Sequence, residues 1–314
     1  MGAFLVRRGA QALVVLVGVT LVTFSLVQLV PGDPIRVSLG TRFDPEVYQL
    51  LRERAGFDQP LPVQYLSYIG NAVTGDLGVS FRSGEPVSQI LMERLPATLT
   101  LTLAAMVVAL LIAIPLGVMS ATRQGTKSDY AATVVSQVGV SVPDFWMAIL
   151  FILLFAGTLG WFPPSGYVSP TESPIGWLHH VALPAVTIGL VSGSILTRFV
   201  RSAVLESLGQ DYTRTARAKG LPEKRVIHHH VLRNAWVPIV TVTGVQLASL
   251  LGGVIVIEVI FGWPGLGRLT LDAVQSRDYP VMQGAVLLFA ALFLLVNLLV
   301  DLLYAALDPR ITYR

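Results

Sequence analysis

The 314-residue chain has no cysteine and few charged residues. Without cysteine it can form no disulfide bond, no thiolate metal site and no cysteine nucleophile. Asp, Glu, Lys and Arg together make up 13% of the sequence, against about 25% in ordinary soluble domains. Hydrophobic residues make up 53%. This composition predicts an integral membrane protein.

The sequence also has no glycine-rich phosphate loop of the form G-x-x-x-x-G-K-S/T, which ATPases use to hold nucleotide phosphates. The nearest segment, Gly125–Ser128, lacks the Gly-Lys pair. We therefore expect the chain itself to hydrolyse no ATP and to bind no cofactor.

Three consecutive histidines, His228, His229 and His230, are the first candidates for metal ligands. Consecutive residues of a helix point about 100° apart, whereas a helical zinc site uses the i, i+4 spacing. We predict no metal site here. Nothing in the sequence indicates a nucleic-acid partner.

Six long apolar runs are present, each able to cross the hydrocarbon core, which takes roughly 20 residues of helix. They cover residues 9–30, 97–121, 131–160, 181–200, 236–261 and 281–307. The third run is longer than one span requires and contains Pro143, which predicts a kink or a steep tilt. The loop 31–96 has apolar spacings that predict two short amphipathic helices. The predicted fold class is all-α integral membrane, with six transmembrane helices in one domain covering residues 1–314.

Lys and Arg are distributed unevenly between the loops, and cytoplasmic loops carry the excess of these residues. The segments after the third and fifth runs hold only Arg268 and Arg277. We therefore expect both termini and the loop 201–235 to be cytoplasmic, and the loop 31–96 to lie outside. The cations assigned to the cytoplasmic side are Arg7, Arg8, Arg123, Lys127, Arg198, Arg201, Arg214, Arg217, Lys219, Lys224, Arg225, Arg233, Arg310 and Arg314.

The loop 201–235 contains a dense basic stretch, "DYTRTARAKGLPEKRVIHHHVLRNA". Asp211 can cap a helix that Gly220 ends, and Pro222 suits the first turn of a second helix. Ala216 and Gly220 lie one turn apart and would leave a bare strip for close approach of a partner. The alternative is that the cations only fix orientation and contact anionic lipid headgroups. That alternative does not explain the helix-Gly-Pro-helix pattern.

Motifs along the whole chain resemble one family. Besides the basic stretch, they are "LVPGDP", "GDLGVSF", "VIFGWPGLGR", "RDYPV" and "VNLLVDLLYAALDPR". Together they resemble the permease subunits of binding-protein-dependent ABC importers. The similarity is to the branch that carries dipeptides, oligopeptides, nickel and glutathione.

The cytoplasmic "EAA" loop of this family has the pattern E-A-A, three residues, G, nine residues, I, one residue, L-P. Aligned on Gly220, the Glu, Ile and Pro of the pattern are replaced by Arg214, His230 and Arg233. The segments "DYTRTARAKG" and "LRNA" resemble instead the variant of the peptide and nickel branch.

The resemblance implies a type I ABC importer permease fold with a cytoplasmic coupling helix, which seats in a groove of an ATPase subunit. The implied partners are a second homologous permease, two ATP-binding subunits that use ATP and Mg, and an extracytoplasmic solute-binding protein. The implied location is the bacterial cytoplasmic (inner) membrane, in contact with lipid. The ATPase-coupling residues carried over are Tyr212, Thr213, Arg214, Thr215, Ala216, Arg217, Ala218, Lys219, Gly220, Leu221 and Pro222.

The expected cargo is di- and oligopeptides, with glutathione, a nickel chelate or another small solute as the alternative. Four polar residues in or near the spans are candidates for the translocation path, since intramembrane polar groups are costly. They are Gln137, Asp144, Gln246 and Glu258. Asp144 could instead cap the second half of a broken helix, and Glu258 could pair structurally with a cation.

A secondary transporter driven by an ion gradient is the main alternative from another class. Such proteins show internal repeats and discontinuous helices around buried charges. We find no repeat, and the Pro143-Asp144 break is the single feature in its favour. An intramembrane enzyme would need converging catalytic groups, which the sequence does not indicate.

Overall fold

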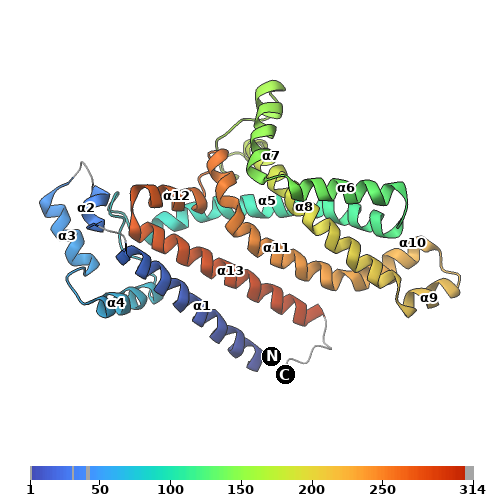
Figure 1. The fold of residues 1–314 in the computed structure, drawn as a ribbon, viewed down its shortest axis with the longest axis horizontal. Helices are drawn as coiled ribbons and strands as arrows, with labels where there is room; N and C mark the ends of the chain where they lie inside the picture. The colour runs from blue at the N-terminus through green and yellow to red at the C-terminus, as the bar shows by residue number, and fades with distance from the viewer. Residues whose placement is uncertain (1, 30–31, 40–42, 308–314) are drawn as a thin grey trace. The chain divides into compact units, whose positions relative to one another are not determined.

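The computed structural model describes residues 2–29, 32–39 and 43–307. Within these ranges the regular structure is helical, apart from one isolated β-bridge between Val79 and Pro86 (Figure 1). Among the residues that the structure describes, five helices are long and apolar enough to cross a membrane. They are α1 (Gly2–Leu29), α5 (Val87–Thr122), α8 (Pro174–Leu208), α11 (Leu232–Ile260) and α13 (Tyr279–Leu307).

The third apolar run forms a bent pair of helices. α6 (Lys127–Ser141) and α7 (Asp144–Phe151), which continues as the π-helix η2 (Ile152–Thr158), meet at an angle of 98°. Pro143 lacks an N–H and keeps the preceding residue extended, and Val142 has φ −90° and ψ 123°. The predicted kink is therefore a near right-angle break, and the described helices give six spans if this pair crosses the membrane as one, or five if it does not.

The chain divides into two compact units, the first comprising residues 1–98 and 264–294. Its short helices are α2 (Pro34–Leu39), α3 (Pro45–Ala55), α4 (Leu61–Val73) and α12 (Leu266–Ser276). The region between α1 and α5 thus holds three helices where the apolar spacing predicts two. One core cluster comprises Val87, Leu91, Leu266, Ala273, Val281 and Ala285, and a second comprises Val27, Ile35, Phe81 and Tyr279.

The second unit comprises residues 99–263 and 295–314 and is organised around α8. This helix packs against α6, α7 and α11 (Figure 1). Glycines let α8 and α5 touch: a Cβ added at Gly189 would lie 2.6 Å from Val108 Cβ, and one added at Gly193 would lie 3.0 Å from the Ala109 carbonyl oxygen. Small residues at helix contacts are typical of membrane proteins, because they let backbones approach closely.

Candidate functional site

The segment between α8 and α11 folds into a helix, a turn and a second helix. α9 covers Asp211–Ala218, α10 covers Glu223–Arg225, and the π-helix η3 (Val226–Val231) leads into α11. Gly220, in the turn, has φ 74°, the left-handed conformation that favours glycine. α8 and α11 extend into the predicted loop 201–235, so the segment outside them is shorter than the sequence indicates. Gln210, not Asp211, occupies the N-cap of α9, and it makes no side-chain capping bond.

α9 is attached to its own chain through one buried side. Thr213 is fully buried, and its Oγ1 donates a hydrogen bond to the Ser207 carbonyl oxygen at 2.9 Å. Ser207 Oγ lies 2.6 Å from the Tyr212 hydroxyl and donates to the Val231 carbonyl oxygen at 2.9 Å. The end of α8, α9 and η3 are thus joined by a small hydrogen-bonded network around Ser207.

The opposite side of α9 is exposed and follows the i, i+3, i+4, i+7 spacing of one helix face. Its members are Asp211, Arg214, Thr215 and Ala218. Ala216 is only 4% exposed and faces the chain itself, so it is not part of a bare strip with Gly220. Gly220 is exposed, and a Cβ added there would meet nothing within 4 Å.

A bidentate ion pair closes the turn between α9 and α10. Arg217 Nη2 donates to Glu223 Oε1 at 2.6 Å, and Arg217 Nε donates to Oε2 at 3.1 Å. The hydrogen bonds to Glu223 raise the pKa of Arg217, whose guanidinium stays charged in any case. The side chains of Arg217 and Glu223 are 43% and 54% exposed, so water screens this contact.

The four path candidates fall in different surroundings. Gln137 is exposed and lines a cavity of about 400 Å³ that contains none of the other three. Asp144 is the first residue of α7, and its Oδ1 accepts from the Phe145 N–H at 2.9 Å. Pro143, not Asp144, occupies the N-cap of α7, and no side chain caps this helix, so the capping alternative is wrong. The Asp144 carboxylate lies in the first turn, at the positive end of α7.

Gln246 and Glu258 both lie on α11. Gln246 Nε2 donates to Ser192 Oγ on α8 at 3.3 Å, so this amide joins two helices. Glu258 is fully buried, and its backbone carbonyl accepts from the Trp263 N–H at 2.8 Å. The sequence predicts these residues by their polarity alone, and the cavity that Gln137 lines is not lined by the other three.

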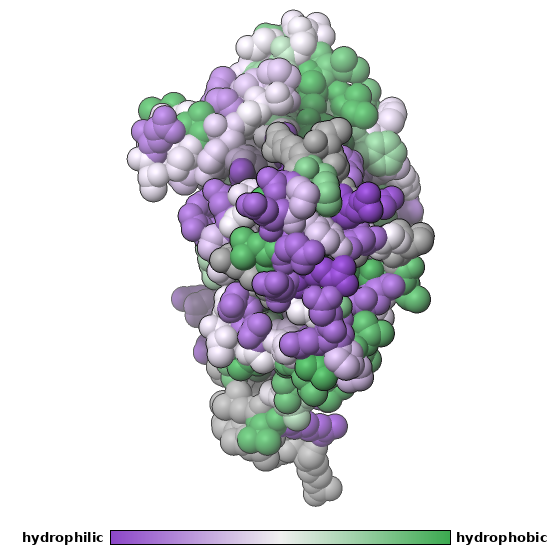
Figure 2. Space-filling model, turned by 90° about the vertical axis from the view of Figure 1, so that its left-hand side faces the viewer, coloured by the Kyte–Doolittle hydropathy of each residue, from purple (hydrophilic) through white to green (hydrophobic). Residues whose placement is uncertain are grey.

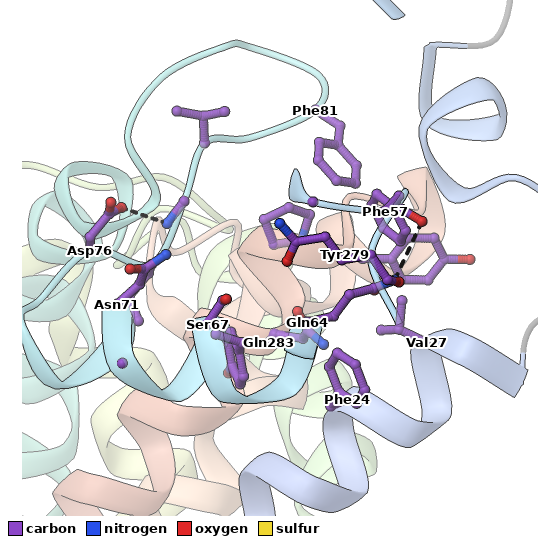
Figure 3. Close-up of a pocket in the computed structure, with 18 of the residues that line it drawn as sticks. Phe24, Val27, Phe57, Gln64, Ser67, Asn71, Asp76, Phe81, Tyr279 and Gln283 are labelled. Carbon is purple, nitrogen blue, oxygen red and sulfur yellow. Dashed lines mark hydrogen bonds between the residues drawn. The ribbon is translucent and has the colours of Figure 1, made fainter. Parts of the chain in front are cut away.

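A second cavity, of about 670 Å³, lies within the first unit (Figure 3). Gln64, Ser67 and Asn71 of α4 line one side, and Phe81 and Tyr279 lie opposite. Among the described residues that line it there are aromatic rings, side-chain amides and the carboxylates Glu53 and Asp76, but no Lys or Arg. Such a lining suits an uncharged or cationic polar ligand or segment. No local sequence pattern predicts this cavity, because its walls come from separate elements.

The side of the first unit where α2, α3 and α4 lie in Figure 1 is largely hydrophilic (Figure 2). A surface rich in polar side chains is suited to water and not to lipid tails.

The fold is that of an ABC importer permease. A chain of the MetNI methionine ABC transporter, in an inward-facing conformation, superposes with a TM-score of 0.60 at 20% identity, covering 71% of this chain and 99% of that chain. A chain of an amino acid ABC transporter with histidines gives a TM-score of 0.52 at 16% identity, with 71% and 95% covered. These similarities establish the fold.

The sequence establishes the family. Residues 113–313 match the family "Binding-protein-dependent transport system inner membrane component", and residues 1–102 match its N-terminal counterpart. The chain belongs to this family. It is 43% identical to the oligopeptide transport system permease AppB of Bacillus subtilis, over the full length of both proteins. It is 42% identical to the dipeptide transport system permease DppB of Escherichia coli, with 99% of each covered.

Family membership confirms the resemblance read from the motifs and the all-helical fold class. The chain is a multi-pass inner-membrane permease subunit of a bacterial ABC importer, and ATP hydrolysis lies in partner subunits. ATPase and binding-protein partners are implied by the same membership. A secondary transporter acting alone is thereby excluded.

Proposed function

We propose that this chain and a second homologous permease form the translocation path for di- and oligopeptides. An extracytoplasmic solute-binding protein delivers the peptide, and two ATP-binding subunits supply the energy from ATP and Mg. The observation that supports this cargo is the full-length identity of 41–43% to permeases named for oligopeptide, dipeptide and di/tripeptide transport. Glutathione, a nickel chelate or another small solute is the alternative cargo for the same machine.

The segment Tyr212–Pro222 is proposed as the ATPase-coupling element. The support is that α9 has two different faces. Thr213 and Ala216 are buried against the rest of the chain, and the opposite face is exposed. Arg214 and Lys219 are exposed cations on this segment, so the complementary surface of the ATPase would be acidic.

The proposed orientation has both termini and α9 in the cytoplasm and the α2–α4 segment outside, with lipid around the spans. Its support is the Lys/Arg asymmetry of the short loops. The α2–α4 segment then forms part of the dock for the binding protein. Gln137, Asp144, Gln246 and Glu258 remain proposed contributors to the path.

The first test is Gly220→Trp. An indole at the open position beside the exposed face should block docking of the ATPase, so we expect ATP-driven uptake to be lost while the protein stays in the membrane. Gly220→Asn is the matched control, because Asn tolerates the left-handed conformation with a small side chain. Wild-type uptake by the Trp variant would refute the coupling role.

The cargo is tested separately with the purified complex in vesicles. Labelled dipeptide, glutathione and a nickel chelate are offered in turn, each with the cognate binding protein. Uptake of dipeptide is expected, and uptake of only another solute would change the cargo without changing the class of machine.

A further inference from the structure

A largely covered ion pair joins α6 and α8 in the second unit, and its carboxylate also binds a hydroxyl of α5. Arg201 of α8 donates from Nε to Asp129 Oδ1 at 2.9 Å and from Nη2 to Asp129 Oδ2 at 3.0 Å. Asp129, at the start of α6, also accepts from the Ser120 hydroxyl of α5 and from the Gly125 N–H at 3.0 Å. One carboxylate is thus held by four donors, and we call the contact between Asp129 and Arg201 the α6–α8 clamp.

Stability alone is a weak reason for such a pair. Taking two charges out of water is costly, and well-packed apolar residues of similar volume often give an equal or better free energy of folding. The Asp129 side chain is 7% exposed and that of Arg201 is 29% exposed. We therefore consider a different role for this ion pair, which is to fix α6 against α8.

The clamp lies close to the network that carries α9. Arg201 precedes Ser207 by six residues of one continuous helix, which is about 9 Å along its axis. Ser207 is the residue that binds Tyr212, Thr213 and Val231. A displacement of α9 that moves the end of α8 consequently moves Arg201 with it.

On its other side the clamp holds the broken helix pair. Asp129 lies at the start of α6, and α6 ends at the 98° break before α7. α6 also touches α8 near its far end, where a Cβ added at Gly139 would lie 2.0 Å from Ser194 Oγ. α6 is therefore bonded to α8 at its start and packed closely against it near its end.

A cavity of about 400 Å³ adjoins the clamp, lined in part by Asp129, Arg201, Ser136 and Gln137. Gln137, proposed above for the path, lies on α6 along this cavity.

We propose that Asp129 and Arg201 are the positioning pair through which displacement of α9 and α8 is transmitted to α6 and the break at Pro143. This inference rests on the proposed coupling role of α9. The proposed role of each residue is to keep α6 and α8 moving as one body.

The test uses the complete transporter, reconstituted in vesicles with its ATPases and binding protein. Single variants leave one charge unpaired and can fail to fold, so the informative variant is Asp129→Asn combined with Arg201→Met, which removes both charges. Transported cargo and hydrolysed ATP are measured together. We expect normal assembly and ATP hydrolysis, with cargo moved per ATP reduced about 5- to 150-fold, the range of typical coupling between sites.

Arg198→Met is the matched control, since Arg198 lines the same cavity on the same helix but is not one of the four donors that bind Asp129. We expect it to keep the wild-type ratio of cargo to ATP. A double variant that assembles and keeps that ratio would overturn the inference, because the pair would then be structural only. Arg201→Lys, which keeps the charge but loses the two-point contact, should give an intermediate ratio.

The two proposals fail in different ways. If Gly220→Trp leaves uptake intact, the coupling role of α9 is refuted whatever the double variant does. If Gly220→Trp abolishes uptake but the double variant transports normally, only the clamp is refuted.

Discussion

Two Arg–carboxylate pairs in the second unit have the same hydrogen-bonding pattern but different surroundings. In each, Nε and Nη2 of the guanidinium bind the two oxygens of one carboxylate. Arg201 and Asp129 join separate helices and are mostly covered, whereas Arg217 and Glu223 close a local turn and are about half exposed.

The difference shows that hydrogen-bond geometry alone does not determine how much an ion pair contributes to the free energy of unfolding. Exposed pairs contribute about 0–1 kcal/mol to the free energy of unfolding, because water screens them and two long side chains must be ordered. Removal of one partner from a buried pair costs about 3–5 kcal/mol, because the other charge is left without compensation. The α6–α8 clamp should therefore hold its two helices in one arrangement, whereas the Arg217–Glu223 contact can open and close at little cost in free energy.

The largest decrease in the free energy of unfolding is expected from Asp129→Asn. The substitution leaves the Arg201 charge without a carboxylate, and the free energy of unfolding is expected to fall by about 2–3 kcal/mol. This is less than the cost for a fully buried pair, because Arg201 keeps some contact with water. Thermal unfolding of the purified complex measures the loss. Glu206→Gln, an exposed acid on α8, is the control and should leave the midpoint unchanged. An equal midpoint for both variants would contradict the buried character of the clamp.

A smaller decrease in stability is expected from Thr213→Val. This substitution keeps the shape of the side chain but removes the hydrogen bond to the Ser207 carbonyl oxygen. Loss of such a buried hydrogen bond costs about 1 kcal/mol. Hydrogen exchange of the α9 amides should become faster by the factor that this free-energy cost gives for the local opening equilibrium.

Thr215→Val is the matched control on the same helix. Thr215 Oγ1 also donates to a backbone carbonyl, that of Asp211 at 2.9 Å, but Thr215 is exposed. Similar exchange rates in the two variants would show that the buried network around Ser207 does not hold α9.

The smallest effect is expected from Glu223→Gln, within about 1 kcal/mol of the wild-type free energy of unfolding. Its unfolding midpoint should also become less sensitive to salt than that of the wild type, since the screened contact is gone. A loss as large as that of Asp129→Asn would remove the distinction between the two pairs.

The long helices were predictable because a run of apolar residues is a local signal. The break at Pro143 was predictable in place but not in angle, since the packing of α6 and α7 against α8 determines how far the chain turns. The helix-turn-helix of α9 and α10 was likewise visible from Gly220 and Pro222.

The contacts that organise the candidate site were not predictable from one sequence. Asp129 and Arg201 are 72 residues apart, and the sequence alone predicts for Arg201 only a place among the cations that set orientation. The inward position of Ala216 depends on how α9 lies against the end of α8 and η3, which no local pattern reports. Pairings between distant segments require the packed structure.

The π-helix η3 has a consequence for the evolution of this segment. A π-turn contains one residue more than an α-turn, so loss of a single residue between Val226 and Val231 would leave an ordinary α-helix. The same loss would rotate everything on its N-terminal side by about 100° around the axis of α11. A single-residue deletion is therefore compatible with the hydrogen bonding of this segment but not with the direction in which α9 faces, and natural variants should not lose a residue here while the sequence changes.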